Sequence, residues 1–206
     1  MMTIQDAIKA RHSVRKYADK PLEMMKVATL RAELEKCNAE SGLNIQLVLD
    51  EPKAFSTGMW KYGQFSGVKN YFVMAGKKTD DLDEKIGYYG EQLVLLAQTL
   101  GLNTCWVGLS FKKNREVVQI REGEKLRCVI ALGYGATQGS GHKIKTLEKV
   151  ARMCSKDGKS MPCDVLPEWF KRGVETALLA PTSLNQQKFT FTLHEPVLDG
   201  KAREGN

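Results

Sequence analysis

The stretch Arg11-His12-Ser13-Val14-Arg15 brings two guanidinium groups and a hydroxyl into one short segment. It follows an expected N-terminal helix, since Thr3 can serve as the N-cap, Asp6 stands three residues later, and apolar side chains then recur at helical spacing up to Arg11. A guanidinium is a planar fork of donors that matches phosphate oxygens, and it stays charged at any working pH. Ser13 adds a neutral donor. The stretch therefore predicts an anchor for a phosphate group, and a solvated basic turn is the alternative.

The composition is that of an ordinary globular protein. Of the 206 residues, 42% are hydrophobic and 27% are charged, which suits one domain or a domain built from two related halves. No apolar run approaches the roughly 20 residues that span a bilayer, and no basic segment followed by an apolar one opens the chain, so we expect neither a membrane segment nor a signal peptide. The five cysteines contain no Cys-x-x-Cys pair, and the three histidines lie far apart. This pattern predicts reduced thiols, no metal site and a cytoplasmic location.

The positive charge leaves two classes of partner open. A formal net charge of +7 permits nucleic-acid binding. The basic residues are scattered, however, and no nucleic-acid motif is present, so we expect no nucleic-acid partner. A positive field attracts phosphorylated small molecules equally well.

The hydrophobic pattern predicts helices and strands in both halves of the chain. Expected helices lie at 21–41, 81–100, 114–120 and 167–180, with one further turn near 147–153 inside an otherwise loop-like segment, 136–165. Expected strands lie at 45–49, 71–75, 128–132 and 189–194, and a short segment at 105–108 leads into a loop. Gly87 and Gly90 are costly inside the 81–100 helix, which predicts the close approach of another backbone or of a ligand there.

Two distant segments share one plan. Residues 21–52 and 167–196 each run from a proline-opened helix through a loop to an alternating strand that ends in Glu-Pro. When Ile45 is laid on Phe189, the side-chain parity of the two strands agrees. Chance also produces helix–strand–proline patterns, so duplication and coincidence both stay open.

Four segments resemble motifs of the FMN-dependent nitroreductase-like flavoproteins. Arg11 to Tyr17 resembles the Arg-x-Ser-x-Arg-x-aromatic motif that grips the FMN phosphate and ribityl chain. Cys105-Trp106-Val107-Gly108 is similar to the family segment whose backbone lies near the flavin.

The other two segments lie in the second half of the chain. Leu132-Gly133-Tyr134-Gly135, with Lys143-Ile144-Lys145 downstream, is similar to the family's Gly-Tyr-Pro strand end and its Lys-x-Arg pair on the phosphate. Residues 180–187 resemble Ala-Pro-Ser-x-x-Asn-x-Gln, the loop that contacts FMN from the partner subunit. Lys145 departs from the pattern, because arginine is usual there.

The resemblance implies an α+β fold with a central, mostly antiparallel sheet flanked by helices, in a single nitroreductase-like domain over 1–206. The last of the four motifs stands at the far end of the chain instead of soon after the first. This order is similar to the subgroup in which two halves of one chain imitate the usual dimer. A pseudo-dimeric monomer with halves 1–150 and 151–206 is therefore one expectation, and a homodimer is the other.

The implied function is that of an FMN-dependent oxidoreductase. It would pass electrons from NAD(P)H to a nitroaromatic, a quinone or a similar small-molecule acceptor by a ping-pong mechanism. No Gly-x-Gly-x-x-Gly follows a strand, so the nicotinamide would bind transiently and without a dinucleotide domain. The implied cofactor-binding residues, none of them assigned a catalytic role, are Arg11, His12, Ser13, Arg15, Trp106, Val107, Gly108, Lys143, Lys145, Pro181, Thr182, Ser183, Asn185 and Gln187.

Two alternatives remain at this stage. Relatives of this type continue further beyond the last strand, which motivates a flavin-binding protein without robust turnover, for FMN storage or sensing. The net charge alone motivates a flavin-free basic protein that contacts an acidic partner.

Overall fold

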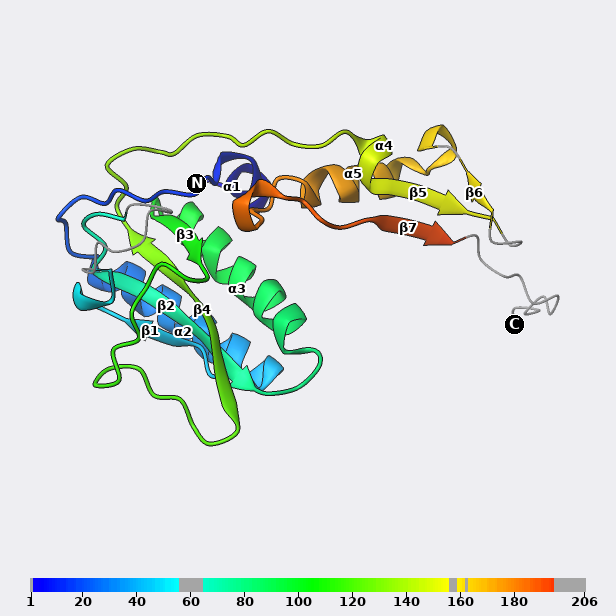
Figure 1. The fold of residues 1–206 in the computed structure, drawn as a ribbon. Helices are drawn as coiled ribbons and strands as arrows, with labels where there is room; N and C mark the ends of the chain where they lie inside the picture. The colour runs from blue at the N-terminus through cyan, green and yellow to red at the C-terminus, as the bar shows by residue number, and fades with distance from the viewer. Residues whose placement is uncertain (1, 56–64, 156–158, 162, 195–206) are drawn as a thin grey trace, which may run out of the picture. The chain divides into compact units, whose positions relative to one another are not determined.

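The structure, a computed structural model, describes residues 2–55, 65–155, 159–161 and 163–194 (Figure 1). The chain divides into two compact units, Met1–Gly141 and His142–Asn206. Each unit is described by itself. The predicted division into halves 1–150 and 151–206 stays a prediction.

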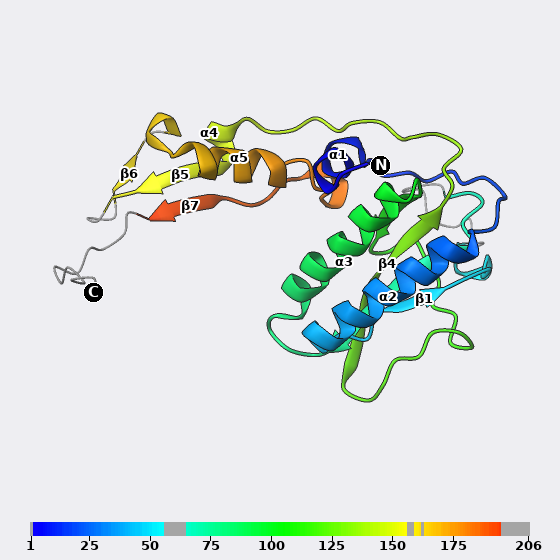
Figure 2. The same ribbon diagram turned by 180° about the vertical axis from the view of Figure 1, so that it is seen from behind.

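The first unit is built on a four-stranded antiparallel sheet in the order β1-β2-β4-β3. Figures 1 and 2 show α2 and α3 side by side on one face of this sheet. The elements are α1 (Ile4–Ala10), α2 (Met24–Ser41), β1 (Gln46–Val48), the 3₁₀ turn η1 (Lys53–Phe55), β2 (Asn70–Lys77), α3 (Leu82–Thr99), β3 (Asn103–Val107) and β4 (Glu124–Gly133).

The core of this unit has a layer on each face of the sheet. Phe72 and Met74 of β2 pack with the apolar side chains of α2 and α3. Tyr71 and Val73 point to the opposite face, where they pack with residues from the N-terminal segment and from the loop after β3. Because both faces are covered, the apolar residues of β2 form a continuous run instead of alternating with polar ones.

Local signals set the ends of the first two helices. Thr3 and Asp6 form a capping box, in which Thr3 Oγ1 accepts a hydrogen bond from the Asp6 N–H at 3.1 Å. Gly42 ends α2 in the left-handed region, with φ of 70°. The second helix begins at Met24, three residues later than expected, because Glu23 is its N-cap and Pro21 lies before it.

The helix expected at 114–120 is wrong, since the structure has only a turn there. Side-chain hydrogen bonds compete with the helix. The Asn114 side chain donates a hydrogen bond to Glu51 and accepts one from the N–H of Glu116. The main-chain N–H and carbonyl of Gln119 both bond to the side chain of Gln46, the first residue of β1. Val118 is thereby drawn into the core.

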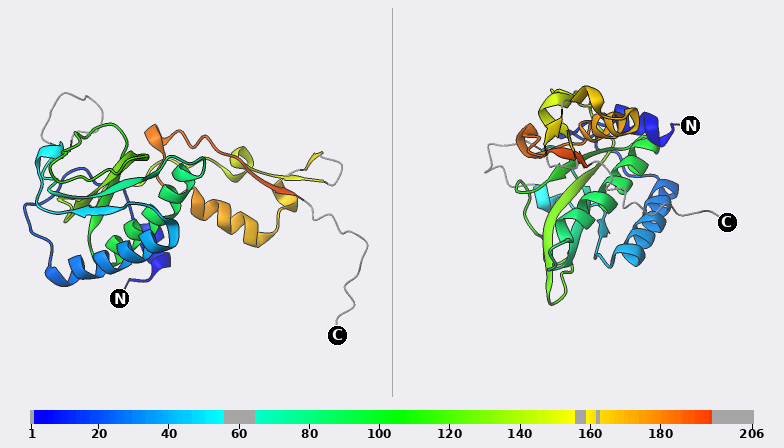
Figure 3. Two further views of the ribbon diagram at one scale, coloured as in Figure 1. Left: turned by 90° about the horizontal axis from the view of Figure 1, so that it is seen from below. Right: turned by 90° about the vertical axis from the view of Figure 1, so that its right-hand side faces the viewer.

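The second unit is a small α/β structure with the strand order β6-β5-β7. β5 is parallel to β7 and antiparallel to β6, and Figure 3 shows α5 along one face of β5 and β7. The elements are α4 (Leu147–Val150), β5 (Ala151–Cys154), β6 (Ser160–Met161), the 3₁₀ turns η2 (Cys163–Val165) and η3 (Ser183–Asn185), α5 (Glu168–Ala177) and β7 (Phe191–His194).

Sequence analysis missed β5, because the turn expected at 147–153 ends as a helix at Val150 and continues as a strand. Val150 and Ala151 pack with Val174 and Leu178 around α5, and this contact favours an extended chain. The two strands of the proposed duplication also have different neighbours, since β1 is antiparallel to β2 whereas β7 is parallel to β5. The duplication stays a prediction. Within the described residues, no helix is long and apolar enough to cross a membrane.

Candidate functional site

The N-terminal motif runs in an extended conformation beside the outer edge of β3. Ser13 forms a parallel bridge with Thr104, and the Val14 N–H donates to the Thr104 carbonyl at 3.0 Å. Val14 is buried and anchors the segment in the core. Arg15, the next residue, is exposed, and Ser13 is half-buried. The edge of the sheet therefore fixes where the motif presents its polar groups.

Arg11, Ser13 and Arg15 of the motif all influence one group of β3, the thiol of Cys105. Burial raises the pKa of this thiol, while the charge of Arg15, a hydrogen bond with Ser13 and the charge of Arg11 act in the opposite direction. Arg11, Ser13 and Arg15 therefore make one electropositive locality, as the phosphate-anchor hypothesis requires.

The segment after β4 lies next to this locality. Asn103 accepts a hydrogen bond from the Gly135 N–H at 2.9 Å and donates to Gln138 at 3.1 Å. A Cβ on Gly139 would come within 2.9 Å of the His12 Cβ, and Gly139 has a φ of 75°. Both facts require glycine there. His12, which is half-buried, is thus packed against the chain that follows β4.

The three predicted residues at the end of β3 have different surroundings. The Trp106 indole N–H donates to Glu91 Oε2 at 3.0 Å, and the Val107 side chain is buried in the core. Gly108 is exposed, and a Cβ added there would meet no atom of the described residues within 4 Å. Only Gly108 therefore leaves open backbone for another molecule.

Sequence analysis missed Glu91, although it came close by singling out Gly90. A Cβ on Gly90 would collide with the Trp106 ring, so the group that approaches this glycine is a side chain and not the backbone or ligand that was predicted. At Gly87 no atom of the described residues lies within 4 Å of an added Cβ, so no backbone of the described residues approaches it, and the approach of a ligand there stays a prediction. The Arg11 Nε lies 3.6 Å from Glu91 Oε1, which links the motif to α3.

In the second unit, hydrogen bonds connect the two remaining predicted segments, which are Lys143 to Lys145 and residues 180–187. Gln187 Nε2 donates to the Lys143 carbonyl at 2.8 Å and to Asn185 Oδ1 at 2.7 Å, while Gln187 Oε1 accepts from the Lys145 N–H at 2.9 Å. Asn185 Nδ2 also donates to the Lys143 carbonyl at 2.8 Å. Both polar atoms of the Gln187 amide thus form hydrogen bonds within the unit, and this residue is only 2% exposed.

The loop that follows α5 has a strained backbone. Leu184, Asn185 and Gln187 have φ of 52°, 53° and 47°, in the left-handed region that residues other than glycine seldom adopt. Thr182 Oγ1 accepts from the Gln187 N–H at 3.1 Å and so closes the loop. Ser183 is exposed, while Pro181 and Thr182 are half-buried.

Comparison with known families settles the class of protein. The sequence model of the family described as "Putative TM nitroreductase" matches residues 3–199. The chain belongs to this nitroreductase family. No protein with a curated description matches it.

Solved nitroreductases share its fold. A putative nitroreductase from Thermotoga maritima MSB8 is 20% identical with a TM-score of 0.58, over 93% of this chain and 71% of that one. An FMN-dependent nitroreductase from Clostridium difficile R20291 is 18% identical with a TM-score of 0.52, over 66% and 90%. A putative NADH dehydrogenase/NAD(P)H nitroreductase from Bacteroides thetaiotaomicron VPI-5482 is 22% identical with a TM-score of 0.55, over 71% and 95%. These likenesses confirm the α+β nitroreductase-like fold.

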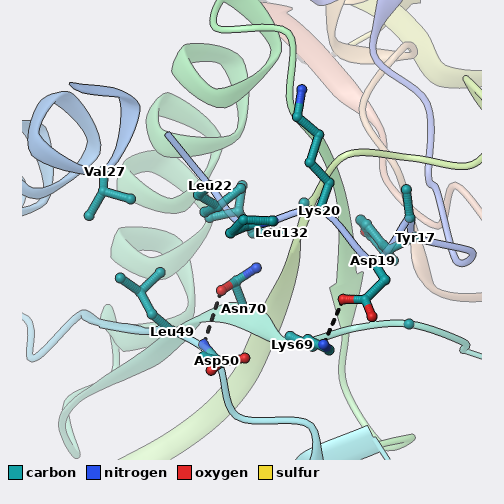
Figure 4. A pocket seen from close by; sticks show the side chains of 14 residues that line it. Tyr17, Asp19, Lys20, Leu22, Val27, Leu49, Asp50, Lys69, Asn70 and Leu132 are labelled. Carbon is teal, nitrogen blue, oxygen red and sulfur yellow. Dashed lines mark hydrogen bonds and ion pairs between the residues drawn. The ribbon is translucent and has the colours of Figure 1, made fainter. Parts of the chain in front are cut away.

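The nitroreductase also has a pocket of about 280 Å³ in its first unit, which contains none of the predicted site residues. Figure 4 shows that apolar side chains, among them Leu22 and Leu49, line the pocket together with charged ones. Among the charged lining residues, Lys69 Nζ lies 2.6 Å from Asp19 Oδ1, so these two charges form an ion pair. The pocket therefore contributes nothing to the phosphate-anchor hypothesis.

Proposed function

We propose that this nitroreductase is an FMN-dependent oxidoreductase that passes electrons from NAD(P)H to a nitroaromatic, a quinone or a similar acceptor by a ping-pong mechanism. One observation carries the proposal. The extended segment that carries Arg11, Ser13 and Arg15 runs beside β3, where Ser13 is bridged to Thr104, and β3 leads into the open backbone of Gly108. A phosphorylated, flat cofactor needs both features close together.

The donor set of the first unit fits the phosphate of FMN. Arg11 and Arg15 supply guanidinium charge, and Ser13 supplies a hydroxyl donor. At the end of β3, Gly108 leaves room for a ring to approach the main chain. The bound flavin would supply the redox chemistry, and the protein supplies binding, orientation and electrostatics.

The second unit supplies a further set of donors in this proposal. Lys143 and Ser183 are exposed, so their side-chain polar groups are available to a cofactor. Asn185 is exposed as well, and its amide also bonds to the Lys143 carbonyl and to Gln187. Lys145 and Gln187 are engaged with one another through main-chain and side-chain hydrogen bonds. We assign them the role of holding the loop, which includes Pro181 and Thr182, in its binding conformation.

Several finer expectations are part of the proposal. The nicotinamide binds transiently over the flavin, and the acceptor takes its place after the first half-reaction. The protein is either a pseudo-dimeric monomer or a homodimer. We also propose a cytoplasmic location and no nucleic-acid partner, since reduced thiols and scattered basic residues support both.

An absorbance spectrum and an FMN titration test the proposal directly. Purified protein should be yellow, or it should take up added FMN to about one equivalent and melt at a higher temperature, because a ligand that binds the folded state stabilises it by mass action. Arg15→Glu should abolish this shift. Lys16→Glu is the matched control, since it makes the same change in charge at the neighbouring exposed residue. Colourless protein with no FMN-dependent shift would refute the proposal.

Turnover separates the enzyme from the storage alternative. Rapid oxidation of NADH or NADPH in the presence of a nitroaromatic or a quinone, with parallel lines in double-reciprocal plots, is expected of the ping-pong oxidoreductase. Protein that binds FMN tightly but oxidises neither nicotinamide would instead be the flavin-binding protein without robust turnover.

A further inference from the structure

Arg11 forms an ion pair with Glu91, a residue of α3. Arg11 is the C-cap residue of α1, where its N–H donates to the Ala7 carbonyl at 2.9 Å, and it is only 3% exposed. Its Nε lies 3.6 Å from Glu91 Oε1. A buried guanidinium requires an opposite charge close by, because desolvation without one is costly. Glu91 provides that charge.

Glu91 uses its two oxygens for two different elements. Oε1 faces Arg11 at the end of α1, and Oε2 accepts the hydrogen bond from the Trp106 indole in β3. The absence of a side chain on Gly90 lets the indole lie against α3. One carboxylate therefore sets the position of the motif's first arginine relative to the strand that ends in the open backbone of Gly108.

The electrostatics of Glu91 agree with this arrangement. Burial raises the pKa of its carboxyl, while the charge of Arg11 and the hydrogen bond from Trp106 act in the opposite direction. Arginine has five N–H donors, so the ion pair through Nε uses only part of its capacity for hydrogen bonds. Fixing a long, flexible side chain in advance reduces the entropy lost when it binds a ligand.

We infer that Glu91 is a positioning residue, which orients the Arg11 guanidinium toward the phosphate of the bound cofactor. The inference rests on the proposed FMN function. It assigns a role in phosphate recognition to a carboxylate that cannot itself bind an anion.

The comparison of FMN with riboflavin, which lacks the phosphate, isolates this role. In Glu91→Gln the affinity for FMN should fall about tenfold, the order expected when a buried charged partner is lost, and that for riboflavin should change less than about twofold. Glu84→Gln is the matched control, since Glu84 is an exposed carboxylate on the same helix. It should leave both affinities unchanged.

A double-mutant cycle shows whether Glu91 acts through Arg11. If it does, Arg11→Ala combined with Glu91→Gln should bind FMN no more weakly than Arg11→Ala alone. Additive losses, equal losses for FMN and riboflavin, or no loss in Glu91→Gln would each overturn the inference. If Glu91→Gln does not fold, Glu91→Asp serves as the test, since it keeps the charge but shortens its reach, and it should also lower the affinity for FMN more than that for riboflavin.

Wild-type protein separates this inference from the proposed function. Protein that binds neither FMN nor riboflavin refutes the function itself. Protein that binds FMN more tightly than riboflavin, with a preference that Glu91→Gln leaves intact, retains the function and refutes the role of Glu91.

Discussion

Lys145 donates two hydrogen bonds to Gln187. The Lys145 N–H donates to the side-chain oxygen of Gln187 at 2.9 Å, and the Lys145 ammonium donates to the main-chain carbonyl of Gln187 at 2.7 Å. Both residues belong to segments that the sequence assigns to the cofactor. Their mutual contact distinguishes residues that support the loop from those that are free to meet a ligand.

This contact predicts different effects for the two lysines. Lys145→Met should destabilise the second unit by about 1–2 kcal/mol even without flavin, because a carbonyl loses its charged donor. Lys143→Met removes an exposed side chain and should change the free energy of unfolding by less than about 0.5 kcal/mol. Amide hydrogen exchange over residues 182–187 measures the difference. Equal exchange in the two variants would contradict the support role of Lys145.

Gly108 provides a test of ligand approach that does not disturb the fold. An added Cβ meets no atom within 4 Å, so Gly108→Ala should unfold at the same denaturant concentration as wild type. If the cofactor lies against this backbone, the methyl group should lower FMN affinity by about tenfold through overpacking at the contact. Calorimetric titration measures the affinity. Unchanged FMN binding would mean that no ring approaches Gly108.

Two glycines of α3 should respond oppositely to alanine. Gly87→Ala enters open space and should stabilise the protein by about 0.5–1 kcal/mol, through the higher helix propensity of alanine. Gly90→Ala would drive a methyl group into the Trp106 ring and should cost about 1–3 kcal/mol. Urea midpoints measure both changes, and tryptophan fluorescence reports displacement of the indole. A stabilising Gly90→Ala would refute the packing described for this helix.

Signals that act over one or two turns of chain were sufficient to predict much of the fold. The capping box of Thr3 and Asp6 and the left-handed Gly42 depend only on neighbouring residues, and the buried run of β2 depends on local hydrophobicity. The turn at 114–120 was mistaken for a helix because Asn114 reaches Glu51, which lies far away in the sequence.

The site shows the same limit at the level of side chains. The sequence indicates which residue types suit FMN, and it contains Arg11, Ser13 and Arg15 in one short segment. It cannot show that the Gln187 amide forms its hydrogen bonds within its own unit. Nor can it show that Glu91 of α3 forms an ion pair with Arg11 at the end of α1. Both facts depend on contacts between elements, for which a single sequence carries no local pattern.

Glu51 should make the stability of the protein depend on acid pH. It is a buried carboxylate that accepts hydrogen bonds from the N–H groups of Lys53 and Ala54, the Tyr71 hydroxyl and the Asn114 amide. Burial alone would raise its pKa, but these four hydrogen bonds outweigh burial and lower it. A carboxyl whose pKa is lower in the folded state binds protons more weakly there than in the unfolded chain. The stability that Glu51 contributes to the folded state is therefore fully present above the ordinary pKa of about 4.5. It is lost as the pH falls through the lower pKa that Glu51 has in the folded protein.

Glu51→Gln should remove this dependence. At pH 7 the variant should be less stable by about 1–3 kcal/mol, since an amide nitrogen would face donors that the carboxylate satisfied. Below about pH 4 the difference from wild type should shrink, because protonation disables the carboxylate as well. Urea midpoints at pH 7, 5, 4 and 3 measure the trend, with Glu116→Gln as the exposed control. Parallel pH profiles for wild type and Glu51→Gln would show that Glu51 does not couple folding to proton release.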